Sequence, residues 1–390
     1  MALPEVRFFK ARSGNSVAYV RQGEGPLVVC PSWWVSNAEK DWGHPSFRRF
    51  FARLGEAVTL VRYDRPGVGL SDPWPDGGTL EAEADLLDDL TAELAADRYG
   101  LFATSCGGPT AILHAARNPG RVDRICFYGS YAEGPAICPK TVQDAVVSAV
   151  EAHWGLGSRA MADIFFPDAD RALLDAFARY QRDSAPAAVA AELLRLTYAM
   201  DARPFLDRVA AETLVIHRRG DRAIPFDCAR VLAAGLAGGR LIALEGRAHP
   251  PWVEGDEIAA LANAFLRGRE VSSGPAPQVA SEPAVAPDAE AARLDAGNRC
   301  LVIAGRRIGL TPLEFAVMRE FARLPNQVVT RDHLLETVWQ RAFEGSNRVD
   351  AVIRGLRRKL GAYAPSIETV IGHGYRFVGW TRERRAKAEA

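Results

Sequence analysis

The sequence predicts an α/β protein whose mostly parallel sheet is joined by a linker to a smaller domain of helices and a hairpin. Apolar runs alternate with helical stretches over the first 270 residues, and a stretch rich in Pro, Ala and Ser covers 271–292. At 390 residues the chain is also too long for one ordinary hydrophobic core. We therefore expect domains over 1–270 and 293–390, separated by a linker whose composition cannot bury a core.

The formal net charge of zero conceals a difference between the two ends of the chain. Residues 291–390 hold 18 Lys and Arg against 10 Asp and Glu, which leaves 30 against 38 for residues 1–290. A basic module attached to an acidic one is the charge distribution that nucleic-acid binding by one end would produce.

Strand-like apolar runs recur along the first domain. They lie at 26–30, 58–63, 101–103, 125–128, 214–217 and 241–244. Their alternation with helical stretches argues for a mostly parallel sheet covered on both faces. Active sites on such sheets lie where the strands end.

Ser105 stands at a sharp turn from a strand into a helix. The segment reads Ala103-Thr104-Ser105-Cys106-Gly107-Gly108 and leads into the helical stretch Pro109–Arg117. Such a turn presents the hydroxyl at the top of the sheet, with the helix dipole and a backbone amide aimed at a developing oxyanion. Small residues are needed around it because the strained turn leaves no room for bulk. Cys106 is an alternative nucleophile, but the register of strand and glycines favours Ser105.

Two later loops supply the partners that a serine nucleophile needs. Asp221 follows the run at 214–217, and His249 follows the run at 241–244. Alone, these residues could be a turn serine, a loop carboxylate and a surface histidine. Their order and their common position at strand ends instead favour a triad in which His249 is the general base and Asp221 holds its tautomer.

Residues 5–268 resemble the α/β-hydrolase fold, with further matches at Tyr63-Asp64-Arg65-Pro66-Gly67-Val68-Gly69-Leu70-Ser71-Asp72 and at Ile224-Pro225. The resemblance implies a helical cap over about 134–208 and an oxyanion hole made by the amides of Trp33 and Cys106. The chain departs from the family pattern at Pro31-Ser32, where relatives commonly have His-Gly. Proline removes a backbone amide there, so we expect this difference to lower catalytic efficiency more than it affects the fold.

Tryptophans border the predicted pocket. Trp34, Trp154 and Trp252, together with Trp33 and Trp42, lie in segments next to it. An aromatic cavity would suit a small apolar or aromatic ligand, although buried tryptophan is as often part of a core.

The second domain begins with a capping signature. Thr311-Pro312-Leu313-Glu314 predicts a helix from Pro312 to about Arg323. Thr330 can cap a second helix. A third helix is expected from Asn347, with an apolar stripe at steps of four, three and four that ends before Gly361. Glycines in the turn at 372–374 then predict a hairpin from 367 to 378.

The face of the third helix opposite its apolar stripe is basic. Major-groove contacts are expected from Asn347, Ala351, Arg354 and Arg358, with Arg348 beside them. Arg357 and Lys359 point sideways and suit phosphates, and Arg376 of the hairpin could reach the minor groove. Alternatively, these charged residues form an ordinary solvent-exposed helix face that does not contact DNA.

This segment resembles the OmpR/PhoB-type winged-helix domain at LTPLEF, VVTRDHLLETVW, RVDAVIRGLRRKLG and IETVIGHGYRF. The resemblance implies binding of double-stranded DNA as a homodimer on direct repeats. It also implies that the second helix and the loop 340–346 face RNA polymerase. Val352 and Gly355 replace polar or basic residues common in the family, so no base preference carries over.

The remaining composition bears on location and cofactors. The six cysteines are scattered without a CxxC pair or metal-type spacing, which favours a reducing cytoplasm and no metal. No apolar signal-peptide core or membrane-length run is present. We expect a soluble cytoplasmic protein without a cofactor or a membrane partner.

Two hypotheses about function follow. In the first, the chain is a DNA-binding transcription regulator whose hydrolase domain senses, and can hydrolyse, a small acyl, ester or lactone-type molecule. In the second, it is an active serine hydrolase whose DNA-binding domain serves localisation or autoregulation. A nucleic-acid-processing enzyme is a weaker hypothesis, because the predicted triad supplies neither a metal site nor a phosphate-binding group.

Overall fold

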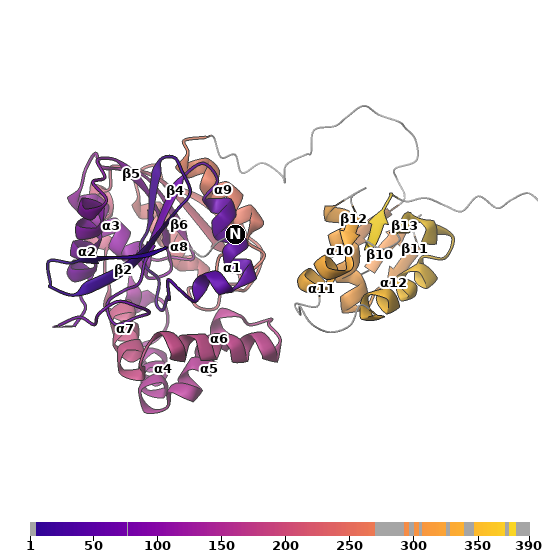
Figure 1. Cartoon of the computed structure of the whole chain (residues 1–390), viewed down its shortest axis with the longest axis horizontal. Coiled ribbons are helices and arrows are strands. Elements are labelled where there is room, and N and C mark those ends of the chain that lie inside the picture. Colours follow the sequence, from indigo (N-terminus) through magenta and orange to yellow (C-terminus); the bar gives the residue numbers. More distant parts are fainter. Residues whose placement is uncertain are drawn as a thin grey trace, which may run out of the picture. The chain divides into compact units, whose positions relative to one another are not determined.

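The computed structural model describes eight ranges of the chain and divides it into two compact units, Met1–Pro275 and Ala276–Ala390 (Figure 1). The described residues are 5–75, 77–269, 292–295, 300–303, 306–324, 328–338, 347–370 and 374–379. Most of the predicted linker, the loop 340–346 expected to face RNA polymerase, and the hairpin residues Gly372 and His373 lie outside them.

An eight-stranded sheet forms the centre of the first unit, in the order β1-β2-β4-β3-β5-β6-β7-β8. Its strands are β1 (Val6–Lys10), β2 (Ser16–Gln22), β3 (Leu27–Cys30), β4 (Thr59–Tyr63), β5 (Tyr99–Thr104), β6 (Val122–Tyr128), β7 (Glu212–Arg218) and β8 (Arg240–Leu244). Strands β3 to β8 pair in parallel, and each overlaps one of the predicted apolar runs, with β3 and β4 beginning one residue later than predicted. Sequence reasoning missed β1 and β2, which pair antiparallel at one edge, because charged and polar residues interrupt them.

Helices cover both faces of this sheet. One face packs against α1 (Pro45–Leu54) and α9 (Asp256–Leu266). The other packs against α2 (Leu80–Glu93), α3 (Gly107–Arg117) and α8 (Phe226–Gly235). The parallel strands are therefore buried on both sides, which explains their nearly continuous apolar sequences.

Four further helices lie between β6 and β7, within the region where the sequence places a cap. They are α4 (Lys140–Ala152), α5 (Trp154–Phe165), α6 (Arg171–Ser184) and α7 (Ala187–Ala199). Figure 1 shows them gathered beyond one end of the sheet. Short 3-10 turns at Gly134–Ala136 and Arg203–Arg208 lead into and out of this group.

A buried carboxylate, Asp64, holds together the loops beside that end of the sheet. It accepts hydrogen bonds from the Ser36 hydroxyl (2.7 Å), the Ala38 amide (3.0 Å) and the Leu70 amide (3.1 Å). Gly69 turns over this carboxylate with φ +58°, and a Cβ there would lie 2.1 Å from Asp64 Oδ2. Only glycine lets the turn close this tightly, because it tolerates a positive φ and has no side chain.

The described residues of the second unit form two small sheets and three α-helices. The first sheet contains β9 (Ala292–Asp295), β10 (Cys300–Ile303) and β11 (Arg306–Gly309), and the second contains β12 (Val328–Thr330), β13 (Ile367–Val370) and β14 (Gly374–Phe377). The helices are α10 (Pro312–Arg323), α11 (Arg331–Val338) and α12 (Asn347–Leu360). The predicted hairpin is present as β13 and β14, while β12 beside it was not predicted.

The predicted helix boundaries of this unit are confirmed. Thr311 and Glu314 form the reciprocal capping box of α10, with hydrogen bonds of 3.3 and 2.7 Å. The Thr330 hydroxyl accepts a hydrogen bond from the His333 amide at the start of α11. On α12 the four stripe residues Val349, Ile353, Leu356 and Leu360 are buried, and Gly361 ends the helix with φ +56°.

Among the described residues, no helix is long and apolar enough to cross a membrane.

Replacing Gly69 with alanine should destabilise the first unit more than replacing another positive-φ glycine. Gly14→Ala is the matched control, since Gly14 has φ +86° with no atom within 4 Å of a built Cβ. The control should lose about 1 kcal/mol from backbone strain alone. Gly69→Ala should lose at least twice that amount in urea unfolding followed by tryptophan fluorescence. Equal losses would show that the turn over Asp64 is not tightly packed.

Candidate active site and nucleic-acid interface

Ser105 lies at the end of β5 in a strained backbone conformation, with φ +51°. Two close approaches hold the turn. A Cβ on Gly107 would lie 2.7 Å from the Pro31 carbonyl oxygen, and one on Gly108 would lie 1.8 Å from Ser130 Oγ. The glycines thus allow α3 to start directly against the neighbouring loops, which is the tight turn that the sequence predicted.

The structure brings together the three residues predicted as a triad. His249 Nε2 lies 3.0 Å from Ser105 Oγ, and His249 Nδ1 lies 2.8 Å from Asp221 Oδ2. The second oxygen of Asp221 accepts hydrogen bonds from the Ala223 and Ile224 amides, which fixes the orientation of the carboxylate. Burial alone would raise the pKa of Asp221, but the neighbouring His249 imidazole outweighs it and holds the pKa below its usual value.

A buried arginine that sequence reasoning missed organises the loop carrying His249. Arg218, at the end of β7, donates hydrogen bonds to the carbonyl oxygens of Ala248, Pro250 and Val253. The carbonyls of Ala248 and Pro250 flank His249 directly, so one guanidinium fixes the backbone on both sides of the imidazole. In the sequence, a charged residue at the end of an apolar strand is the feature that could have indicated this role for Arg218.

The cap also contacts His249. The His249 amide donates a hydrogen bond to the Phe165 carbonyl at the end of α5, and the two rings lie 5.1 Å apart. Arg247 forms an exposed ion pair with Asp168. Any displacement of the end of α5 would therefore act on the backbone that positions the imidazole.

Cys106 adjoins Ser105 but points into the protein interior. Its Sγ accepts a hydrogen bond from Arg65 at 3.3 Å, and burial raises the pKa of the thiol. A buried thiol with a raised pKa is a poor nucleophile, which supports the choice of Ser105. Trp33, in the loop after β3, lines the cavity that contains Ser105. The oxyanion hole from the Trp33 and Cys106 amides remains a prediction.

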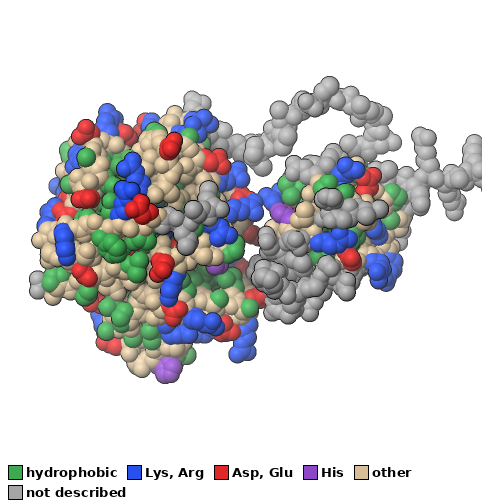
Figure 2. Space-filling view, viewed as in Figure 1, with side chains coloured by type: hydrophobic (Ala, Val, Ile, Leu, Met, Phe, Trp, Pro, Cys, Tyr) green, Lys and Arg blue, Asp and Glu red, His purple; other side chains and the backbone are tan. Residues whose placement is uncertain are grey.

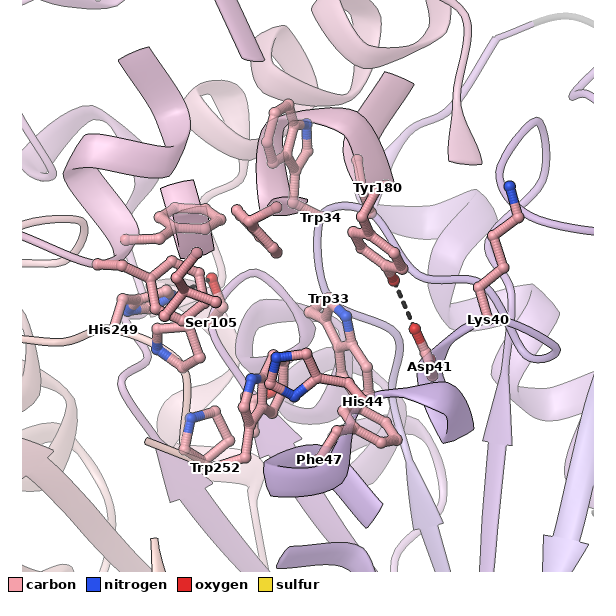
Figure 3. Close-up of a pocket in the computed structure, with 18 of the residues that line it drawn as sticks. Trp33, Trp34, Lys40, Asp41, His44, Phe47, Ser105, Tyr180, His249 and Trp252 are labelled. Carbon is pink, nitrogen blue, oxygen red and sulfur yellow. Dashed lines mark hydrogen bonds between the residues drawn. The ribbon is translucent and has the colours of Figure 1, made fainter. Parts of the chain in front are cut away.

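A cavity of about 290 Å³ opens beside Ser105 and His249 (Figure 3). Trp33, Trp34 and Trp252 line it, in agreement with their predicted positions. Trp154 does not line it, so its placement in the pocket was wrong. Its indole N–H donates to the Ala185 carbonyl, and its ring packs edge-on against Trp34 at 6.1 Å.

The sequence did not identify the other lining residues. Aromatic rings come from the cap, and polar groups come from the loop after β3; they include Phe165, Phe166, Phe177, Tyr180, Lys40, Asp41 and His44. No local pattern identifies these residues, because whether they face the cavity depends on how the cap packs on the sheet.

Asp41 is a buried carboxylate at the edge of this cavity. It pairs with the buried Arg62 at 3.1 Å and accepts a hydrogen bond from the Tyr180 hydroxyl. Burial raises the pKa of Asp41 to about 7, even though Arg62 acts in the opposite direction. The Arg62 guanidinium also lies over the Phe47 and Phe51 rings, 4.8 and 4.9 Å from their centroids.

Among the described residues, no group of three or more His, Cys, Asp or Glu side chains could hold a metal ion.

On the second unit, Arg354 and Arg358 of α12 expose their side chains. In Figure 2, blue Lys and Arg side chains lie over the stretch that Figure 1 labels α12. Arg376 of β14 is 42% exposed and pairs with Glu368 at 2.8 Å. The predicted contacts Asn347, Arg348 and Ala351 lie on α12, but their side chains fall outside the described part of the structure.

Two residues predicted to contact phosphates have other partners in the structure. Arg357 donates to the Ile367 carbonyl (2.6 Å) and to Thr369 Oγ1 (2.8 Å), which ties α12 to β13. Lys359 Nζ lies 2.6 Å from Glu314 Oε2 and 3.1 Å from the Gly309 carbonyl. Both residues therefore help to hold the domain together. Phosphate contact through their remaining N–H donors stays a prediction.

Gly355, noted as a departure from the family pattern, has a packing role. A Cβ at this position would lie 3.0 Å from Glu314 Oε1. Glycine lets the capping carboxylate of α10 approach α12, and this approach places Glu314 beside Lys359.

Comparisons with known proteins give separate matches for the two units. Residues 27–264 match the family described as "Alpha/beta hydrolase family", and residues 305–377 match "Transcriptional regulatory protein, C terminal". The second unit is 46% identical over 74 residues to the transcriptional regulatory protein CseB of Streptomyces coelicolor, which covers 19% of this chain and 31% of that protein.

The first unit has both sequence relatives and structural neighbours. It is 30% identical over 138 residues to a cis-3-alkyl-4-alkyloxetan-2-one decarboxylase of Shewanella oneidensis, covering 33% of this chain and 40% of that protein. An esterase from Exiguobacterium antarcticum superposes with a TM-score of 0.61 at 20% identity, covering 67% of this chain and all of the esterase. The esterase supports the fold alone. The chain spans about a third of the length of the first curated relatives that it matches.

Asp41→Asn should change how stability depends on pH. Native Asp41 keeps its proton up to about pH 7, whereas an unfolded aspartate releases it near pH 3.9. This group's contribution to stability is therefore complete below about pH 4 and is lost as the pH rises toward 7. The loss should be on the order of 1 kcal/mol per pH unit between about pH 4 and 6 and should level off near pH 7. Urea unfolding at pH 5, 6 and 7 should show this slope in the wild type and not in the variant; identical slopes would contradict the assignment.

Arg354→Ala and Arg358→Ala should each weaken binding to a random-sequence DNA duplex. Removing one positive charge from the DNA-binding face should reduce the magnitude of the slope of log K against log salt by up to about 0.9, because fewer counterions are released. Fluorescence anisotropy between 50 and 200 mM salt measures this slope. Arg171→Ala, an arginine 88% exposed on α6, is the control with the same change in charge. An equal effect in the control would mean that α12 does not contact DNA.

Proposed function

The chain belongs to the alpha/beta hydrolase family and carries an OmpR/PhoB-type DNA-binding domain over residues 305–377, and on this basis we propose that it is a ligand-responsive transcription regulator. Its hydrolase domain binds a small acyl, ester or lactone-type molecule and hydrolyses it. The observation that carries this proposal is the hydrogen-bonded series Ser105, His249 and Asp221 beside an aromatic cavity, in a chain that also contains a DNA-binding domain.

The triad geometry supports a defined acyl-transfer sequence. Ser105 Oγ attacks the carbonyl carbon and forms a new C–O bond while its proton passes to His249 Nε2. That proton then goes to the leaving alcohol oxygen as the original ester bond breaks. Water attacks the acyl-serine, His249 takes its proton, and Ser105 leaves as the hydroxyl with release of a carboxylic acid. Asp221 stays ionised throughout and stabilises the charged imidazole.

The relatives are consistent with this carbonyl class. The Shewanella protein is named for an oxetan-2-one, which is a four-membered lactone. The CseB match favours regulation of transcription as the output. By the same resemblance, the chain acts as a homodimer in contact with RNA polymerase.

An active hydrolase that uses its DNA-binding domain for localisation or autoregulation is the second candidate. The 3.0 Å contact from His249 to Ser105 supports turnover in this candidate as it does in the first. Ser105→Ala separates the two. In this variant, a regulator that responds to ligand binding still changes its DNA affinity when the ligand is added. A protein whose response depends on turnover shows the same DNA affinity with and without the ligand.

Fluorophosphonate labelling of the full chain tests the hydrolase half. We expect a covalent adduct on the peptide containing Ser105 by mass spectrometry, and no adduct in Ser105→Ala or His249→Ala. A folded protein that stays unlabelled would remove hydrolysis from the proposal and leave ligand binding.

The same preparation tests the regulatory half. The adduct fills the cavity as a trapped acyl group would, so DNA affinity should differ at least about fivefold between labelled and unlabelled protein. Duplexes selected from a random-sequence pool serve as the DNA, and Ser105→Ala treated with the reagent is the control. Equal affinities would contradict coupling between the cavity and DNA binding.

A further inference from the structure

The cavity beside Ser105 has an aromatic wall on the side of the sheet. Trp33, Phe47 and Trp252 pack against one another with ring centroids 5.0 to 6.0 Å apart. All three line the cavity, and Figure 3 shows them together along one side of it. Their mutual packing makes this wall rigid before any ligand enters.

A second aromatic wall comes mainly from the cap. Trp34 contacts Phe165, Phe165 contacts Phe177, and Phe177 stacks on Tyr180, with centroid distances of 5.9, 5.8 and 5.7 Å. These four rings also line the cavity. A ligand therefore lies between two rows of aromatic rings, a setting that favours a flat aromatic group, since rings gain from stacked and edge contacts with other rings.

The cavity has a polar group at each end. Figure 3 shows Ser105 and His249 on one side and Asp41 with Lys40 on the other, while Trp33 and Trp34 lie between them. A carbonyl held at Ser105 would direct the rest of the ligand along the aromatic walls toward Asp41. An aliphatic tail would leave the polar far end without a partner.

The charges and hydrogen bonds at the Asp41 end of the cavity favour an uncharged ligand group. The Tyr180 hydroxyl donates a hydrogen bond to the ionised form of Asp41, so the Tyr180 oxygen is left to accept a hydrogen bond. Lys40 pairs with Asp183 at 3.2 Å across partly exposed positions, and its ammonium has further donors. An anionic ligand would meet the Asp41 carboxylate, and a cationic one would meet the Lys40 ammonium. A ligand hydroxyl can donate a hydrogen bond to the Tyr180 oxygen.

From these contacts we infer that the ligand is an ester, thioester or lactone built on a hydroxylated aromatic ring, with its hydroxyl bound at Tyr180 and its carbonyl at Ser105. The inference rests on the proposed function of Ser105 and adds the chemical class of the ligand. We assign specificity for the hydroxyl to Tyr180, because it lines the cavity and Asp41 holds its hydroxyl in place.

Titration calorimetry on full-length Ser105→Ala tests this class without turnover. The ligands are ethyl 4-hydroxycinnamate, ethyl cinnamate and ethyl octanoate. We expect the octanoate to bind at least tenfold more weakly than the cinnamate, and the hydroxyl to improve affinity about fivefold or more. Adding Tyr180→Phe should abolish the gain from the hydroxyl and preserve binding of the unsubstituted ring. Tyr198→Phe, on α7 and away from this cavity, is the matched control and should keep the gain.

Several results would overturn the inference. One is equal affinity for the octanoate and cinnamate esters. Another is equal affinity for the cinnamate esters with and without the hydroxyl. A third is a hydroxyl-dependent increase in affinity that persists in Tyr180→Phe. Binding of none of the three esters by a protein whose wild type is labelled at Ser105 would also overturn it, while the proposed hydrolase function would stand. The protein could also bind the aromatic esters through Tyr180 while fluorophosphonate leaves Ser105 unlabelled. That result would support the ligand class and contradict only hydrolysis.

Discussion

The turn at Ser105 is the constraint on which the rest of the candidate active site depends. A serine at φ +51° is unfavourable by itself, and it persists because its surroundings leave no alternative. Gly107 packs against the Pro31 carbonyl and Gly108 against Ser130, so α3 cannot shift without a collision. The hydroxyl is fixed at the end of β5, and His249 and Asp221 can then align on it from two separate loops.

The cap does more than cover this arrangement. Phe165 supplies a ring to the cavity wall and a carbonyl to the His249 amide, so ligand contact and imidazole position share one residue. At the far end, Tyr180 links the cap to Asp41 on the sheet side. A ligand between the two walls would thus act on both attachments of the cap. This gives the proposed regulator a physical element whose position ligand binding can change.

The second unit uses several of its basic residues internally. Arg357 and Lys359 hold α12 against β13 and the start of α10, and Arg331 pairs with Asp350 at 3.0 Å. Arg354 and Arg358 remain exposed on α12. A count of charges therefore overstates the positive surface available to DNA, because part of it is neutralised within the domain.

The sequence by itself determined the two folds, the parallel strands, the boundaries of α10 and α12, and the three residues that meet at Ser105. These features depend on local signals, such as apolar periodicity, capping residues and the order of loops at strand ends. Only the tertiary structure decided that Trp154 supports Trp34 behind the cavity, that Arg218 fixes the His249 loop, and that Asp41 meets Tyr180. Each of these depends on which side of a helix or loop faces a segment distant in the chain, and local periodicity does not specify that packing.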